Sequence, residues 1–174
     1  TVVTAYGLTE STGMVTICRP EDDADLIAST SGRALDGIEV KCANPATGAE
    51  VPRGAEGEIW VRGYNVMQGY FELPEATAET ITADGWLKTG DIGVMDAQGY
   101  LRITDRLKDM YIMNGENVYP AEVEKALYSL PGVAQVAVIG VPKQPQGEVG
   151  MAFVVPVAGA AVDEAAVKAF CAGR

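Results

Sequence analysis

The sequence predicts an α+β protein made of a mostly β first unit and a small α+β second unit. Between Gly32 and Arg106, the strand candidates IEVKCA, GEIWVRG and GYLRITD are separated by turn sequences such as NPATG, PRGAEG and DAQG. After Asp109 the pattern changes to a helix, two strands and a second helix. The pattern therefore indicates two units that meet near Asp109.

The first unit begins with TVVTAY, whose β-branched and aromatic residues predict a buried strand that ends at Gly7. A polar loop, LTESTG, follows this strand. The rest of the unit is predicted as short strands with one short helix, at EATAETI.

The second unit is predicted to contain two helices around the strands QVAVIGV and MAFVVPV. Pro120 suits the first position of a helix, which the dipeptide PG then ends. Asp163 is a candidate N-cap for the last helix. The two helices present these apolar side chains for burial: Val123, Ala126, Leu127, Leu130, Val162, Ala166, Val167 and Phe170.

Composition excludes several classes of function. A net charge of -11 argues against binding to nucleic acid, whose phosphates attract basic proteins. The chain has no histidine, which excludes a Ser/His/Asp hydrolase, a histidine-bound metal and a histidine general base within it. The cysteines Cys18, Cys42 and Cys171 form no CxxC pair, which argues against a disulfide framework and a zinc site.

The ends and the hydropathy suggest a part of a cytoplasmic protein. No apolar run approaches the roughly 20 residues that span a bilayer, and TVVTAYG lacks the basic start of a signal peptide. We therefore expect no transmembrane segment and a cytoplasmic location. Because the chain starts at Thr1 without a methionine and stops just after a helix-like segment, we expect a piece of a longer protein.

Four stretches contain residues suited to chemistry: YGLTESTG, GYNVMQGY, DGWLKTGD and YLRITDRLKDMYIMNGENVYPAEVE. Taken singly, Thr9, Glu10 and Asp91 read as turn or cap residues, and the charges around Arg106 read as a solvated turn. Taken together, a hydroxyl and a carboxylate can hold a phosphate and Mg²⁺, an aspartate can accept ribose hydroxyls, and an arginine can donate to ribose or phosphate. This set describes a nucleotide site without a GxxxxGK loop.

The stretches YGLTE, GEIWVRGYNVMQGYF, DGWLKTGD and GYLRITDRLKDMYIMNGENVYPAEVE, in this order, resemble the later core motifs of the adenylate-forming (AMP-binding) superfamily. This superfamily includes acyl-CoA synthetases, luciferases and peptide-synthetase adenylation domains. The resemblance implies that residues 1–107 are the β-rich, distorted barrel-like end of a large N-terminal domain. It also implies that residues 108–174 are a truncated, mobile C-terminal domain.

The resemblance also implies a role for individual residues. It makes Thr9 and Glu10 catalytic, with Glu10 as the Mg²⁺ ligand. It places Lys108 at the hinge and Gly115 in a loop on the coenzyme A side. The implied nucleotide-binding residues are Tyr6, Gly7, Leu8, Thr9, Asp91, Ile103 and Arg106.

The implied reaction joins a small carboxylic acid to coenzyme A in two half-reactions. The acid attacks the α-phosphate of ATP, and the thiol of coenzyme A then displaces AMP from the acyl adenylate. The sequence DRLKDMYIMNGENVYP is similar to acyl-CoA ligases of fatty or aryl acids, and TSGRAL, VRGYNVM and RITDRLKDM are similar to actinobacterial ligases for fatty and steroid-derived acids. The substrate, and assembly into a homo-oligomer, stay open.

The chain departs from the family pattern in three places. The phosphate loop is expected upstream of Thr1 and the lysine that promotes adenylation downstream of Arg174, so we expect the chain alone to be inactive. Lys143 stands where the family often has aspartate. Two alternatives stay open: a catalytically silent nucleotide-binding or regulatory module of the same fold, and a peptide-synthetase adenylation domain.

Overall fold

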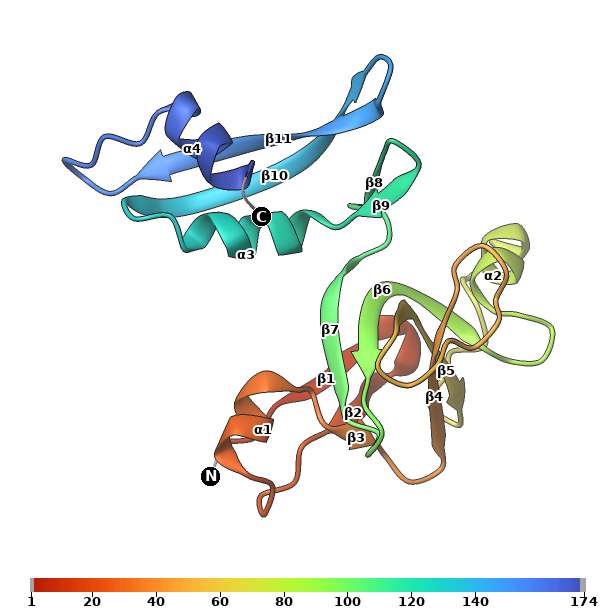
Figure 1. Ribbon diagram of the computed structural model, residues 1–174. Coiled ribbons are helices and arrows are strands. Elements are labelled where there is room, and N and C mark those ends of the chain that lie inside the picture. The colour runs from red at the N-terminus through yellow and green to blue at the C-terminus, as the bar shows by residue number, and fades with distance from the viewer. Residues whose placement is uncertain (1, 173–174) are drawn as a thin grey trace. The chain divides into compact units, whose positions relative to one another are not determined.

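The computed structural model describes residues 2–172 and confirms the α+β class. The chain divides into two compact units, Thr1–Thr104 and Asp105–Arg174, and each has its own hydrophobic core. Figure 1 shows the order of the elements along the chain. The boundary after residue 107, which the sequence suggested, stays a prediction.

The first unit opens with a three-stranded antiparallel sheet in the order β1-β2-β3. Its elements are β1 (Ala5–Leu8), the 3₁₀ turn η1 (Thr9–Ser11), β2 (Gly13–Ile17), helix α1 (Ala24–Ser29) and β3 (Arg33–Ala34). The predicted bounds of the first strand were wrong, because β1 continues through Gly7 to Leu8. A Cβ on residue 7 would lie 1.6 Å from the Gly13 carbonyl oxygen, so only glycine allows this close approach.

A four-stranded sheet in the order β4-β5-β6-β7 completes the first unit. Its strands are β4 (Ile38–Ala43), β5 (Glu56–Gly63), β6 (Leu87–Met95) and β7 (Leu101–Arg106), and the predicted helix α2 (Pro74–Thr80) precedes β6. Ile59, Leu87 and Leu101 are fully buried in its core. The described residues form open sheets and no closed barrel, so the barrel-like part of the expectation is corrected to open sheets.

The second unit has a sheet in the order β10-β11-β8-β9, against which two helices pack. Its elements are β8 (Tyr111–Met113), β9 (Glu116–Val118), α3 (Pro120–Tyr128), β10 (Val133–Lys143), β11 (Gly147–Pro156) and α4 (Glu164–Cys171). Pro120 opens α3 as predicted. The predicted N-cap Asp163 accepts the Ala166 N–H at 2.8 Å.

Two short features organise the start of the second unit. Strands β8 and β9 form a hairpin around Asn114 and Gly115, whose φ angles of 54° and 86° are those of a two-residue type I′ turn. The Asp105 carboxylate, at the end of β7, accepts the Ala121 N–H at 2.9 Å and so satisfies a donor in the first turn of α3.

The three cysteines differ in their exposure. Cys18 and Cys42 are buried, Cys171 is exposed, and all three are free thiols. Burial raises the pKa of Cys42 to about 11. None of the helices within residues 2–172 has the length and apolar character needed to span a bilayer.

The core of the second unit gives a stability prediction. Leu127 is fully buried between α3 and the sheet, so Leu127→Ala is expected to lower the free energy of unfolding by about 2–5 kcal/mol, through lost burial and the cavity left behind. Tyr128→Ala, at an exposed position of the same helix, is the control and should cost much less. Urea denaturation followed by circular dichroism measures both, and equal losses would contradict the assignment of Leu127 to the core.

Candidate functional site

Two of the four stretches meet through a buried tyrosine. Tyr6 in β1 is 8% exposed, and its hydroxyl donates to a carboxylate oxygen of Asp91 in β6 at 2.7 Å. The two residues are 85 positions apart in the sequence, so this contact joins the three-stranded and four-stranded sheets of the first unit. The half-buried Asp91 is therefore held in a defined orientation.

Asp91 belongs to a bulge in β6. Glu58 of β5 pairs with Ile92 and Trp60 pairs with Lys88, so that residues 89–91 together face the single residue Ile59. Such bulges redirect side chains and are common beside active sites. Gly90, at the centre, has a φ of +73°, a conformation that glycine adopts at low cost.

The hydroxyl of Thr89 closes one side of the bulge. It donates to the Ile59 carbonyl oxygen at 2.7 Å and accepts the Asp91 N–H at 3.1 Å. These bonds satisfy backbone groups that the strand ladder cannot reach at this point. The motif TGD therefore forms a folded unit in which the threonine and glycine set the position of the aspartate.

The turn after β1 carries Thr9 and Glu10. Thr9 is exposed in η1, and the half-buried Glu10 accepts the Tyr70 hydroxyl at 3.0 Å through its carboxylate. The Glu10 carbonyl oxygen also accepts the Met67 N–H at 2.8 Å. The stretch GYNVMQGY thus contacts the turn that holds Glu10, a role that the sequence did not assign to Tyr70.

The environment of Tyr70 follows from this contact. Burial raises the pKa of the Tyr70 phenol, and the hydrogen bond to the Glu10 carboxylate adds to the shift, because both disfavour the phenolate. The neutral phenol stays a donor to Glu10 across the physiological range. The carboxylate is thereby oriented by its neighbour.

The carboxylate of Glu10 fits a magnesium ion only if the substrate shares the ion. No group of three or more His, Cys, Asp or Glu side chains that could hold a metal occurs within residues 2–172. Mg²⁺ is usually held by one or two carboxylates together with substrate phosphates, and Glu10 next to an exposed threonine hydroxyl matches that pattern. The donor set does not fit a cage made of protein ligands alone.

The other predicted residues lie on separate elements. Leu8 ends β1 and packs against the core of the first unit, and Ile103 on β7 is 38% exposed. Arg106 and Lys108 are exposed in the turn that the Asp109 N–H closes onto the Arg106 carbonyl oxygen at 3.1 Å. The structure brings Tyr6 to Asp91 and Tyr70 to Glu10, and the roles predicted for Arg106, Lys108 and Gly115 stay predictions.

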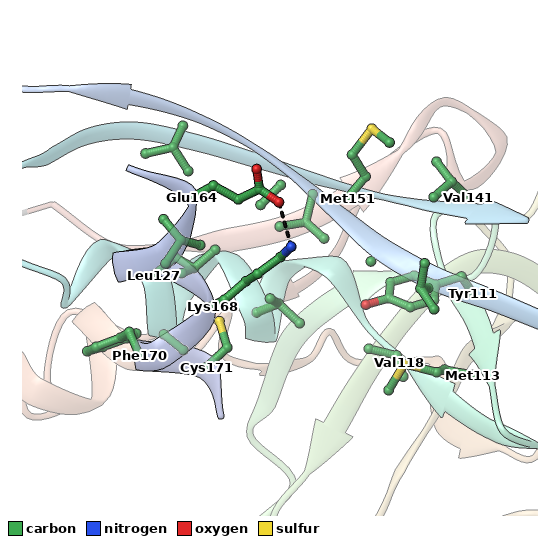
Figure 2. Close-up of a pocket in the computed structure, with 18 of the residues that line it drawn as sticks. Tyr111, Met113, Val118, Leu127, Val141, Met151, Glu164, Lys168, Phe170 and Cys171 are labelled. Carbon is green, nitrogen blue, oxygen red and sulfur yellow. Dashed lines mark hydrogen bonds and ion pairs between the residues drawn. The ribbon is translucent and has the colours of Figure 1, made fainter. Parts of the chain in front are cut away.

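A cavity of about 1110 Å³ lies in the second unit, and Figure 2 shows its lining. The walls are mostly apolar, and the Glu164 and Lys168 side chains in the lining are paired with each other. None of the residues predicted to bind nucleotide or metal lines this cavity. We therefore do not assign it to the predicted chemistry.

The contact between Tyr70 and Glu10 predicts a measurable change in acidity. Replacing Glu10 by glutamine removes the negative charge but not the burial, so the pKa of Tyr70 should fall and still stay above its ordinary value. A pH titration of the tyrosine ring carbon signals by NMR measures the shift. Glu75→Gln, at an exposed position of α2, is the control, and an unchanged Tyr70 pKa in the Glu10 variant would contradict the contact.

Comparison with known proteins matches both units to one family. Residues 1–71 match the family described as AMP-binding enzyme, and residues 122–174 match the AMP-binding enzyme C-terminal domain. The chain is 56% identical to a 3-[(3aS,4S,7aS)-7a-methyl-1,5-dioxo-octahydro-1H-inden-4-yl]propanoyl:CoA ligase of Rhodococcus jostii, over 99% of this chain and 31% of that protein. It is 57% identical to the ligase of the same description from Mycobacterium tuberculosis, over 97% of this chain and 31% of that protein.

A solved structure gives the same result for the fold. ATP-bound MatB from Rhodopseudomonas palustris matches with a TM-score of 0.90 and 42% identity, over 98% of this chain and 33% of that chain. The chain spans about a third of the length of these relatives. The sequence identity, the two family matches and the fold all agree. The chain therefore belongs to the adenylate-forming, AMP-binding enzyme family.

Proposed function

We propose that the protein to which this chain belongs is an ATP-dependent carboxylic acid–CoA ligase. The observation that carries the proposal is the hydrogen bond between Tyr6 and Asp91, which unites two motifs 85 residues apart in one site. The identity to two CoA ligases over nearly the whole chain supports it.

In the first half-reaction, a carboxylate oxygen of the acid attacks the α-phosphorus of ATP, and the bond to the pyrophosphate oxygen breaks. The products are an acyl adenylate and pyrophosphate. We assign Asp91 to the ribose hydroxyls, because its carboxylate is fixed by the bulge and by Tyr6. Thr9, exposed in η1, is assigned to the α-phosphate, and Gly7, Leu8 and Ile103 to the adenine side.

Glu10 is assigned to Mg²⁺. The ion, when bound, supplies positive charge that neutralises the phosphates and the leaving pyrophosphate. The contribution of this chain is to orient the Glu10 carboxylate through the Tyr70 hydroxyl and to hold the Glu10 backbone through the Met67 N–H. Positioning and charge stabilisation are the main demands of the reaction on the protein, and neither requires a histidine.

In the second half-reaction, the thiolate of coenzyme A attacks the acyl carbonyl carbon and AMP leaves. We assign Lys108 to the pivot between the two steps, Arg106 to the ribose and Gly115 to the coenzyme A side. A cytoplasmic location and a part in fatty acid metabolism are proposed on the sequence alone. The acid is proposed to resemble the substrate of the two ligases, a propanoic acid side chain on a fused carbocycle.

The activity test uses the full-length protein with Mg·ATP, coenzyme A and a panel of fatty, aryl and fused-ring propanoic acids. Release of pyrophosphate and AMP with at least one acid is expected, whereas the 174-residue chain alone should form no acyl adenylate.

Asp91→Asn should lower kcat/KM for ATP roughly 10- to 100-fold, because it removes a charged acceptor for the ribose. ATP binding without release of pyrophosphate for any acid would favour the catalytically silent module. Transfer of the acyl group to a carrier domain would favour the peptide-synthetase branch.

The pivot gives a separate prediction. Lys108→Pro in the full-length protein fixes φ at residue 108 and restricts Leu107, so thioester formation should be impaired more than adenylation. Pyrophosphate release and acyl-CoA formation, measured separately, show the difference. Lys108→Ala is the control, since it removes the charge but leaves the backbone free. Equal loss of both half-reactions would argue against the pivot.

A further inference from the structure

We propose that Glu58 is a positioning residue that holds the bulge of residues 89–91 so that Asp91 faces the ribose. The proposal rests on the proposed function for the ribose contact. Its structural basis is one side chain with two partners. One Glu58 carboxylate oxygen accepts the Gly90 N–H at 3.1 Å, and the other accepts the Trp60 indole N–H at 2.7 Å.

The burial of Glu58 is unusual for a glutamate. The residue is 4% exposed and lies on β5, two positions before Trp60, so both side chains point to the same face of the strand. A carboxylate in such a place is costly unless its oxygens are hydrogen-bonded. Both oxygens of Glu58 have a donor, one from its own strand and one from the bulge of β6.

Trp60 is a fixed support for this carboxylate. Its ring is 7% exposed and packs with Ala43 and Trp86, and the Lys41 ammonium nitrogen lies 4.7 Å from its centroid. A side chain held on its faces in this way has little freedom to move its N–H. Glu58 therefore connects the bulge to a rigid part of the sheet.

The Gly90 N–H is the point at which a side chain can control the bulge. Gly90 is the middle of three residues that face Ile59 alone, so the regular ladder between β5 and β6 is interrupted there. Thr89 fixes one side of Asp91 through the Asp91 N–H, and Glu58 fixes the preceding peptide. Without Glu58, the Thr89–Gly90 peptide can rotate, and the Asp91 carboxylate loses its alignment.

This role predicts an effect that depends on the ribose. The test is done with the full-length protein and compares ATP with 2′-deoxyATP and 3′-deoxyATP, each of which lacks one ribose hydroxyl. The preference for ATP is the kcat/KM for ATP divided by the kcat/KM for each deoxynucleotide. Glu58→Gln should lower this preference roughly tenfold, so that it approaches the value expected for Asp91→Asn. The values for the deoxynucleotides should change little. A general loss of structure would instead lower all three.

Two further variants sharpen the test. Glu56→Gln makes the same chemical change two residues earlier on β5 and is the matched control, which should keep the preference for ATP. The single amide oxygen of Glu58→Gln can accept only one of the two N–H groups, so when it accepts the Trp60 N–H its NH₂ group faces the Gly90 N–H. Adding Trp60→Phe removes one donor and frees the amide oxygen for the Gly90 N–H. The double variant should therefore recover most of the ATP preference that the single Glu58 variant loses.

Hydrogen exchange of the Gly90 amide in the same full-length variants tests the contact without using activity. Exchange should be roughly tenfold faster in Glu58→Gln and unchanged in Glu56→Gln. Unchanged exchange, or an equal loss of kcat/KM for all three nucleotides, overturns the proposal for Glu58. A wild-type protein that releases no pyrophosphate with any acid overturns the proposed function instead, and the exchange result still decides whether Glu58 holds the bulge.

Discussion

The first unit depends on an interruption in its own sheet. Regular pairing of β5 with β6 would place the side chains of residues 89–91 alternately on the two faces of the sheet. The direction of each side chain would then be determined by the strand alone. The bulge instead gives Asp91 a position that a turn-forming glycine, a threonine hydroxyl and a tyrosine from another sheet determine together. The hydroxyl of Thr89 bonds backbone groups of Ile59 and Asp91 that the interrupted ladder leaves without a strand partner.

The same principle applies around Glu10, although the element is a 3₁₀ turn. The turn alone does not fix the Glu10 carboxylate, since Thr9 is exposed and Glu10 is only half-buried, although Ser11 is fully buried. The stretch between β5 and α2 supplies the missing contacts from Tyr70 and Met67, and Thr12 in turn donates to the Asn65 carbonyl oxygen at 2.7 Å. Each candidate carboxylate thus has a tyrosine donor from a distant part of the chain.

Within residues 2–172, the sequence predicted the class, six of the eleven strands and three of the four helices, because these follow from alternation, apolar spacing and caps such as Asp163. Strands β2, β3 and β6 were missed. Helix α1, with Asp23 as its N-cap, was missed although the capping signal is present, and the β8–β9 hairpin was missed although Asn-Gly is its usual turn. The roles of Glu58 and Tyr70 could not be predicted. Glu58 reads as an ordinary solvent-facing position of an alternating strand, and only the bulge opposite it explains its burial.

The end of β7 has a consequence for how this region can change in evolution. Side chains alternate along the strand from Leu101, which is fully buried, to Asp105, which caps the start of α3. Asp105 and its partner Ala121 both lie in the second unit, so the cap depends on the residue type at position 105 and on the length of chain from Asp105 to α3. Residue 105 can therefore change without loss of the cap only to another side chain that accepts a hydrogen bond.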